Sequence, residues 1–333
     1  MDSQEAEALY APAARKVLEA FGVPASELRF ISLSENVTFR VTDARDGRSL
    51  TLRLHRPGYH DLASLMSERV WVRALAEAGI PAPVPLQSIA GRDYEMIHVE
   101  ATDEARFASL ASWIEGALLS AQVAAEPDRG RVRQYFGELG ALMGRLHTQA
   151  CAWSAPEGFR RRILDADGLM GGEPLWGDFW RHQALTPRQS RLLLSARDRL
   201  YGALQRYGTD PSVFSLIHAD LHPGNVVITP LGAAVIDFDD AGYGWLLYDL
   251  ASALYSYQTH EDFHGFRDAC LEGYETVRTL PGRARDLLPM FILVRNLAQI
   301  GWHHQRPEIT TGPAQKRLIE ITCTQAAAFA PPL

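Results

Sequence analysis

The sequence predicts an α+β protein with a small antiparallel sheet near its N-terminus and a larger helical part after it. Three observations support this fold class. Apolar residues alternate with more polar ones between Val37 and Leu54, the period of two that is typical of half-buried strands. Apolar residues recur at helical spacing before this segment and over most of the chain after about residue 105. A short island of β-like segments, residues 213–236, interrupts the helical part.

The N-terminal part, residues 1–99, is predicted to contain the sheet and two helices. Helical spacing runs from Ser3 to Phe21 and again from Leu62 to Ala78, where Gly79 ends it. Between the helices, Asp46-Gly47 is a strong hairpin signal. The expected strands are Arg29–Ser34, Val37–Val41, Leu50–Leu54, Val84–Ile89 and Tyr94–Val99. The sequence therefore predicts a five-stranded antiparallel sheet with one helix inserted after its third strand.

The C-terminal part, residues 100–333, is predicted to be mainly helical. Amphipathic stretches run from Gly137 to His147 and from Arg188 to Tyr207, and helices resume between about Leu246 and Ala328. The island inside this part has short β segments around a loop rich in His, Asp, Pro and Gly. Functional side chains are often carried on such loops by a rigid scaffold.

Composition narrows the class of partner. The net charge of −7 disfavours nucleic acid and anionic membrane, which are bound through basic patches. Three widely spaced cysteines, Cys151, Cys270 and Cys323, argue against a disulfide framework or a zinc site. The N-terminus has no signal-peptide pattern, and no apolar stretch is long enough to cross a bilayer. These features predict a cytoplasmic protein whose main partner is neither nucleic acid nor membrane, and they leave its oligomeric state open.

The island carries the residue types that phosphoryl transfer needs. It contains His218-Ala219-Asp220-Leu221-His222-Pro223-Gly224-Asn225 and then Ile236-Asp237-Phe238-Asp239. The chemistry requires a carboxylate that orients the attacking hydroxyl, and oxygen ligands that hold Mg²⁺ on the phosphates. Asp220 can supply the first, and Asn225 and Asp237 can supply the second because Mg²⁺ prefers hard oxygen donors. We therefore predict Asp220 as the catalytic residue and Asn225 and Asp237 as metal ligands.

These motifs resemble those of the aminoglycoside-phosphotransferase and choline-kinase superfamily. Asp237-Phe238-Asp239-Asp240, followed by Trp245-Leu246-Leu247-Tyr248-Asp249-Leu250-Ala251, adds to the resemblance, which covers about residues 25–310. The segments Leu54-His55-Arg56-Pro57-Gly58-Tyr59 and Pro174-Leu175-Trp176-Gly177-Asp178-Phe179-Trp180 are similar to the homoserine-kinase-like and stress-response Ser/Thr-kinase-like branch. The resemblance implies a bilobal protein-kinase-like fold, with ATP and Mg²⁺ between an N-terminal and a C-terminal lobe.

The resemblance also implies nucleotide-binding roles by position. Arg53, on the third strand, stands where the family has the basic residue that contacts the α- and β-phosphates, and Glu68 would be its ion-pair partner. Residues 33–37 take the place of the phosphate-covering loop, where Ser34 and Asn36 could approach phosphate. Met96 to Val99 would form the hinge that meets adenine.

Other residues are expected near the phosphoryl acceptor or in support of the loop. Asp239 and Asp240 could bind a cationic group, with support of Mg²⁺ or plain solvation as the alternative, and Arg295 and Trp302 could line the acceptor's approach. His218 is expected to hydrogen-bond within the loop. Asp249 is expected to accept hydrogen bonds that tie the catalytic region together.

The function predicted from the sequence is an ATP- and Mg²⁺-dependent kinase that phosphorylates a hydroxyl of a small amine- or amino-acid-like molecule. Two alternatives stay open at this point. One is a Ser/Thr protein kinase of the same fold, which the absence of an Ala-Pro-Glu element after Asp237 disfavours. The other is a nucleotide-binding regulator without catalysis, which the glycine-free loop and Arg53 would suit and the intact Asp220 would not.

Overall fold

The computed structural model describes residues 3–34, 36–280, 282–307 and 312–331. The chain divides into two compact units. Unit 1 comprises residues 1–116, 155–160 and 234–239, and unit 2 comprises residues 117–154, 161–233 and 240–333. An antiparallel sheet comes first in the chain and a largely helical region follows it, which confirms the α+β class.

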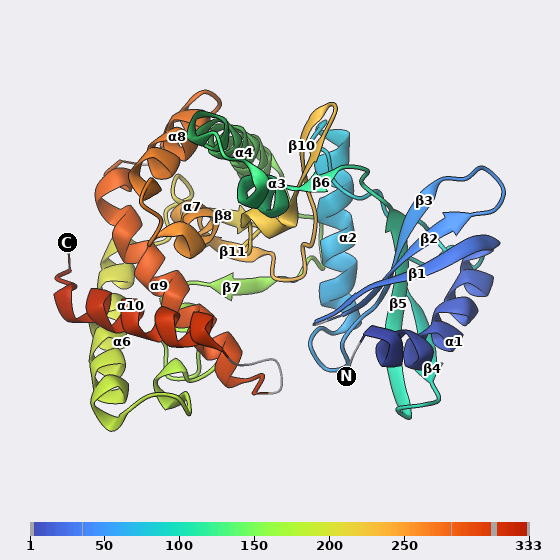
Figure 1. Cartoon of the computed structure of the whole chain (residues 1–333), viewed down its shortest axis with the longest axis horizontal. Helices are drawn as coiled ribbons and strands as arrows, with labels where there is room; N and C mark the ends of the chain where they lie inside the picture. The colour runs from blue at the N-terminus through green and yellow to red at the C-terminus, as the bar shows by residue number, and fades with distance from the viewer. Residues whose placement is uncertain (1–2, 35, 281, 308–311, 332–333) are drawn as a thin grey trace. The chain divides into compact units, whose positions relative to one another are not determined.

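Unit 1 contains a five-stranded antiparallel sheet of order β1-β2-β3-β5-β4, with two helices (Figure 1). Its elements are α1 (Ser3–Phe21), β1 (Ala25–Leu33), β2 (Val37–Asp43), β3 (Ser49–Leu54), α2 (Leu62–Glu77), β4 (Glu95–Val99) and β5 (Glu104–Ser112). The predicted hairpin joins β2 to β3, where Gly47 adopts a φ of 73° that a residue without Cβ accepts at little cost. The predicted helix 62–78 agrees with α2 to within one residue.

The alternation in β2 and β3 sorts their side chains onto two faces. Val37, Phe39 and Val41 share one face with the alternate leucines of β3, and all of them are buried against the apolar side of α1. Successive side chains of a strand point to opposite faces, so Arg53, between Leu52 and Leu54, lies on the other face. The fold thus places the predicted phosphate-binding arginine away from the α1 core.

Two secondary-structure predictions in this part of the chain are wrong. Residues 84–89 form only an isolated bridge between Pro85 and Ala111, because proline lacks the N–H that a ladder requires. The segment 104–112, which we expected to begin the helical part, is β5. Alanine, leucine and glutamate favour helices locally, but pairing on both sides with β3 and β4 overrides that preference.

The β5 correction also moves the expected hinge. Met96 and Val99 lie on β4, the edge strand, paired with Phe107 and Glu104 of β5, so these residues are not a connection between units. The chain leaves unit 1 after β5, at Gly116, and not at residue 99 as the sequence suggested. The hinge assignment was therefore displaced by one strand.

Unit 2 combines helices with short strands. Its elements are β6 (Ala117–Leu118), α3 (Leu119–Ala125), α4 (Arg129–Ala152), β7 (Arg162–Leu164), α5 (Ala166–Met170), η1 (Phe179–Arg181), α6 (Pro187–Tyr207), β8 (Phe214–Ile217), η2 (Pro223–Asn225), β9 (Val226–Thr229), β11 (Gly242–Trp245), α7 (Leu246–Leu254), η3 (Tyr255–Tyr257), α8 (Phe263–Glu275), α9 (Ala284–His304) and α10 (Pro313–Ala328). Strand β10 (Gly232–Val235) carries the chain from unit 2 into unit 1. Among the described residues, no helix combines the length and apolarity needed to span a bilayer.

A three-stranded sheet in unit 2 positions the loop that follows β8. Strand β11 pairs antiparallel with β8 and parallel with β7. Strand β8 ends at Ile217, directly before His218, and β11 runs into α7, which carries Asp249. Because Ile217 pairs with Gly242 at the start of β11, the predicted catalytic loop begins at the opposite end of this pair from the β11–α7 junction. Helix α7 reaches the loop through Asp249, which accepts hydrogen bonds from the backbone of His218 and Ala219.

Helices α4 and α8 approach each other through glycines. A Cβ placed on Gly140 would lie 1.9 Å from the carbonyl oxygen of Cys270, and one on Gly273 would lie 2.0 Å from that of Gly137. Real Cβ atoms do not come so close, so the two backbones can meet only where no side chain intervenes. This contact holds His147 of α4 and Tyr274 of α8 within hydrogen-bonding distance, 3.0 Å between Nδ1 and Oη.

Candidate active site

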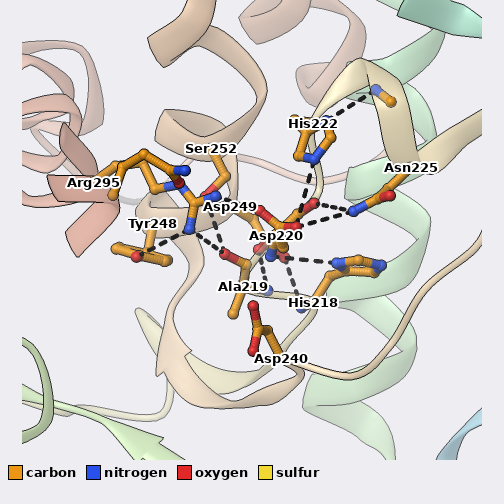
Figure 2. Close-up of polar contacts among 12 residues, drawn as sticks. His218, Ala219, Asp220, His222, Asn225, Asp240, Tyr248, Asp249, Ser252 and Arg295 are labelled. Carbon is orange, nitrogen blue, oxygen red and sulfur yellow. Dashed lines mark hydrogen bonds and ion pairs between the residues drawn. The ribbon is translucent and has the colours of Figure 1, made fainter. Parts of the chain in front are cut away.

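Asp249 anchors the loop that carries Asp220 (Figure 2). This aspartate is fully buried, and its two carboxylate oxygens accept hydrogen bonds from the backbone N–H groups of His218, at 2.9 Å, and Ala219, at 2.7 Å. His147 Nε2 lies 3.1 Å from Asp249 Oδ2 and braces it from α4. The expectation that Asp249 ties the catalytic region together by accepting hydrogen bonds is confirmed.

The loop is held in a conformation that needs such an anchor. Ala219 has a φ of 66°, a left-handed backbone that costs energy for a residue with a side chain. Its carbonyl oxygen accepts from Ser252 Oγ at 3.2 Å and from Arg295 Nη1 at 3.4 Å. The Asp220 N–H donates to His218 Nδ1 at 3.3 Å, so the expected hydrogen-bonding role of His218 within the loop is also confirmed.

The Asp220 carboxylate is fixed at both of its oxygens. Arg295 Nη2 pairs with Oδ1, while Asn225 Nδ2 donates to Oδ2 at 3.1 Å and to the Asp220 carbonyl at 3.0 Å. His222 Nε2 lies 3.5 Å from Oδ2. Burial would raise the pKa of Asp220, but Arg295, and after it His222 and His218, together outweigh burial and hold the pKa well below its usual range. Asp220 is therefore an ionised carboxylate of fixed orientation.

Arg295 lies deeper than the sequence suggested. It is buried in the middle of α9, with its guanidinium 5.0 Å from the ring centre of Tyr255 and 5.9 Å from that of Tyr248. Burial opposes the charge, but the Asp220 carboxylate keeps the pKa of Arg295 well above its ordinary value. The expectation that Arg295 lines the acceptor's approach is corrected, because this side chain supports Asp220 from the protein interior.

The other residues expected near the acceptor have local partners of their own. Asp240 belongs to unit 2 and forms an ion pair with Arg162 at 3.3 Å. Trp302 lies two turns beyond Arg295 on α9, and Arg306 covers its ring at 4.5 Å. Asp239 is buried and pairs with Arg53, so the structure gives it a partner other than the cationic group predicted for it.

Asp239 instead helps to hold Arg53 in unit 1. Arg53 Nη1 lies 3.0 Å from Asp239 Oδ1 and 3.2 Å from Asp237 Oδ1. Burial would lower the pKa of Arg53, but Asp237 and Asp239, and after them Glu68, raise it above its ordinary value. Glu68 is thus close enough for its charge to act on Arg53, while the ion pair predicted between the two side chains stays a prediction.

The segment that carries Asp237 is fixed on both sides. Phe238 packs edge-on against Trp71 of α2, with ring centres 5.5 Å apart. Asn36 donates from Nδ2 to Asp239, and its Oδ1 accepts from the Arg56 N–H at 3.0 Å. Asn36 is therefore a buried support of this segment, and its predicted approach to phosphate stays a prediction. Ser34 is exposed beside it, and Glu35, in the same predicted loop, lies outside the described residues.

Asp237 and Asn225 have the donor chemistry that a hard cation requires. Asp237 has a φ of 66°, and its side chain is 42% exposed although Asp239, two residues on, is buried. Asn225 uses its amide nitrogen on Asp220, which turns its amide oxygen to the other side. Mg²⁺ typically takes one or two protein oxygens and completes its shell with water and phosphate oxygens, so these two residues fit the ion.

Sequence reasoning missed the groups that support the site from a distance. His147, Tyr248 and Tyr255 were not singled out, although each packs against Asp249 or Arg295. His147 stood at the end of the amphipathic stretch 137–147, where a histidine on an apolar face was a usable signal. The tyrosines offered none, since an aromatic residue in a buried helix is usually part of the core.

Comparison with known proteins identifies the family. Residues 27–287 match the model of the phosphotransferase enzyme family. Amicoumacin kinase of Bacillus subtilis (strain 168) is 26% identical over 312 residues, which cover 90% of this chain and 86% of that protein. Homoserine kinase of Pseudomonas aeruginosa (strain PAO1) is 29% identical over 299 residues, covering 85% and 78%.

A solved structure agrees with these sequence matches. The microcompartment-associated aminopropanol kinase superposes with a TM-score of 0.79 at 27% identity, over 95% of each chain. The resemblance drawn from the motifs around Asp220 and Asp237 is thereby confirmed. This chain belongs to the phosphotransferase enzyme family and is an ATP-binding kinase of that family that acts on a small molecule.

Proposed function

We propose that this kinase transfers the γ-phosphoryl group of Mg²⁺-ATP to a hydroxyl of a small amine- or amino-acid-like molecule. The observation that carries the proposal is the Asp220 carboxylate, which is ionised, held at both oxygens and still 24% exposed. Such a group can orient a hydroxyl, whereas a carboxylate used only for structure would be as buried as Asp249.

The names of the relatives support the acceptor class. Homoserine and aminopropanol, from which two of them take their names, are small molecules with an amine and a hydroxyl. Asp240 lies near Asp220 in unit 2, and its carboxylate could accept a cationic group in place of its ion pair with Arg162 (Figure 2). We keep Asp240 as the candidate that binds the acceptor's ammonium group, which would replace Arg162 as its ion-pair partner.

The mechanism assigned to these residues is positioning followed by late proton transfer. The acceptor hydroxyl donates a hydrogen bond to Asp220. Its proton passes to that carboxylate as the acceptor oxygen bonds to the γ-phosphorus and the bond from that phosphorus to the bridging oxygen breaks, which releases ADP. Asn225 and Asp237 would hold Mg²⁺, and the bound ion would neutralise charge on the phosphates. Arg53 would contact the α- and β-phosphates. A guanidinium has five N–H groups, and Asp237 and Asp239 both contact Nη1, so N–H groups on the other nitrogens can donate to phosphate.

Release of ADP in the presence of candidate acceptors tests this function. The library contains amino alcohols, hydroxy amino acids, sugars and aminoglycosides, and generic protein substrates are included to test the protein-kinase alternative. Asp220→Asn is the control for contaminating kinases. We expect turnover with one or more amino alcohols or hydroxy amino acids that disappears in the control. Turnover only with protein substrates, or ATP binding with no turnover on any acceptor, would contradict the proposal.

A further inference from the structure

Arg295 and Asp220 form a pair in which the two partners differ in their access to solvent. The Arg295 side chain is 6% exposed and the Asp220 side chain is 24% exposed. The arginine therefore approaches the carboxylate from the protein interior, and the carboxylate faces the side from which an acceptor can arrive. An arginine placed in this way contacts Asp220 without occupying the acceptor's position.

The hydrogen bonds to Asp220 leave it little rotational freedom. An ionised carboxylate offers about four acceptor positions on its two oxygens. Arg295 uses one on Oδ1, Asn225 uses one on Oδ2, and His222 lies within 3.5 Å of Oδ2. Rotation about the bond to the carboxylate would break the contacts at both oxygens together. The positions that stay open therefore point in a fixed direction.

Arg295 is itself held on a rigid element. Most residues of α9 between Leu287 and Gly301 are buried, and the guanidinium contacts the rings of Tyr248 and Tyr255 and the carbonyl of Ala219. Tyr248 in turn stacks on Trp176, with ring centres 6.1 Å apart and planes 4° from parallel. Groups that are packed on helices hold a catalytic geometry more closely than groups on loops. Arg295 can thus transmit the rigidity of α9 to the catalytic loop.

We propose that Arg295 is the positioning residue for Asp220, holding the carboxylate in the orientation that receives the acceptor hydroxyl. The role rests on the proposed function, because it concerns the geometry of that phosphoryl transfer. Arg295 does not touch the acceptor. It acts through Asp220, and a planar guanidinium suits this role better than an ammonium because its fork can bond the carboxylate and the Ala219 carbonyl together.

The test compares Arg295→Met, Arg295→Lys and the double variant Arg295→Met/Asp220→Asn. The kcat is measured with the best acceptor of the screen, and background ATP hydrolysis, in which water replaces the acceptor, is measured in parallel. Small displacements of a catalytic group can cost about 10²-fold, so we expect Arg295→Met to lower kcat by about 10²-fold with KM for acceptor and ATP within about threefold. Arg295→Lys should recover about tenfold of that loss. Arg133→Met, which removes a surface ion pair with Asp262, is the matched control.

The double variant distinguishes positioning from a general effect on folding. If Arg295 acts through Asp220, its removal should change kcat little once Asp220 is Asn, so the two losses should not multiply. Multiplying losses, an unchanged kcat, or a raised acceptor KM at constant kcat would each overturn the positioning role. If Arg295→Met does not fold, the same cycle with Arg295→Lys decides. If the wild type is active and the variants are unaffected, only the positioning role of Arg295 is refuted. If the wild type turns over ATP with neither acceptor nor water, the proposed function and the positioning role are refuted together.

Discussion

The two units each contain an arginine paired with aspartate, but the partners have opposite positions. In unit 1, the Arg53 side chain is 19% exposed and has Asp239 at 9% exposure on one side and Asp237 at 42% on the other. In unit 2, Arg295 is buried and the single aspartate, Asp220, is the partner that reaches solvent. Unit 1 uses two carboxylates to hold one arginine, and unit 2 uses one arginine to hold one carboxylate.

The comparison separates working groups from supporting groups. In both clusters the more exposed member, Asp237 or Asp220, is the one expected to meet metal or substrate. The buried members, Asp239 and Arg295, fix it in place. Charge alone would not have made this distinction, since Asp237 and Asp239 have the same chemistry two residues apart. Within an ion-paired cluster, the exposure of a side chain therefore distinguishes working from supporting groups better than its charge does.

Replacing Asp237 should have the largest effect. If Asp237 and Asn225 hold Mg²⁺, Asp237→Ala should abolish turnover and leave the thermal unfolding transition in place. Asp237→Asn is the better matched variant, because asparagine tolerates the left-handed backbone at φ 66°. Both variants are assayed over a range of Mg²⁺ concentrations. The Asp237→Asn variant should need a higher Mg²⁺ concentration than wild type for half-maximal turnover.

Asp239→Asn provides the contrast that the comparison requires. As a supporting residue, Asp239 should affect the melting temperature more and the Mg²⁺ requirement less than Asp237 does. Near wild-type activity of Asp237→Ala at limiting Mg²⁺ would remove Asp237 from the metal site. A greater Mg²⁺ requirement in Asp239→Asn than in Asp237→Asn would reverse the two roles.

Asp220→Asn should have the next largest effect. Asparagine keeps the shape and can accept a hydrogen bond, but it cannot take the proton of the acceptor hydroxyl. General base catalysis of this kind is typically worth about 10²–10⁴-fold, and we expect a kcat loss in that range. ATP affinity should change little, because other groups hold the nucleotide. Equilibrium titration with ATP and turnover measurements test both halves. Collapse of ATP binding would make Asp220 structural, and surviving turnover would place the base elsewhere.

Arg53 and Glu68 should differ in the size of their effects on ATP use. Arg53→Ala should lower kcat/KM for ATP strongly, since it would remove the proposed phosphate contact and leave Asp239 buried without this partner. Arg53→Lys keeps the charge and is the control for folding. Glu68→Ala should act more mildly, through its charge on Arg53 alone. Equal losses from Glu68→Ala and Arg53→Ala would mean that Glu68 contacts the nucleotide itself.

The smallest effect near neutral pH is expected in the polar interior of unit 1, where acid should lower the free energy of unfolding. Burial lowers the pKa of His55 to about 3, and its Nε2 lies 3.1 Å from Ser109 Oγ. The unfolded chain has an ordinary histidine pKa of about 6.5, so the unfolded state binds the proton first. The stability from neutral His55 is complete above about pH 6.5 and is lost as pH falls toward 3, by up to about 1.4 kcal/mol per pH unit. Chemical unfolding of His55→Gln should show a shallower slope in this window, and an unchanged slope would assign the acid sensitivity to other groups.

The sequence predicted the catalytic loop better than its supports, for a physical reason. His218, Asp220 and Asn225 lie within eight residues, so their spacing directly reflects the loop geometry. Arg295 lies 75 positions after Asp220, and Asn36 lies 203 positions before Asp239. Such pairs meet only through the packing of whole elements, which no local pattern records. Asp249 was predicted because residues 245–251 resemble a motif of the family, and not because its distance from His218 could be inferred.

The error at β5 had a different origin and a larger consequence. Residues 104–112 contain helix-favouring residues, and the strand is formed by its neighbours β3 and β4. Because β5 was assigned to the helical part, the predicted end of the N-terminal region and the predicted adenine hinge were both placed one strand too early in the chain. Residues 113–116, which follow β5 at the end of unit 1, are the segment where a hinge now has to be sought.

The glycine contact between α4 and α8 limits how this enzyme can evolve. Gly140 and Gly273 let the backbones of the two helices touch. The same helices carry His147 and Tyr274, which contact each other, and His147 in turn contacts the Asp249 carboxylate. A single methyl group at either glycine would push the helices apart and loosen the anchor of the catalytic loop. Random mutagenesis should therefore yield inactive variants at these glycines, although neither has a functional group that could take part in chemistry.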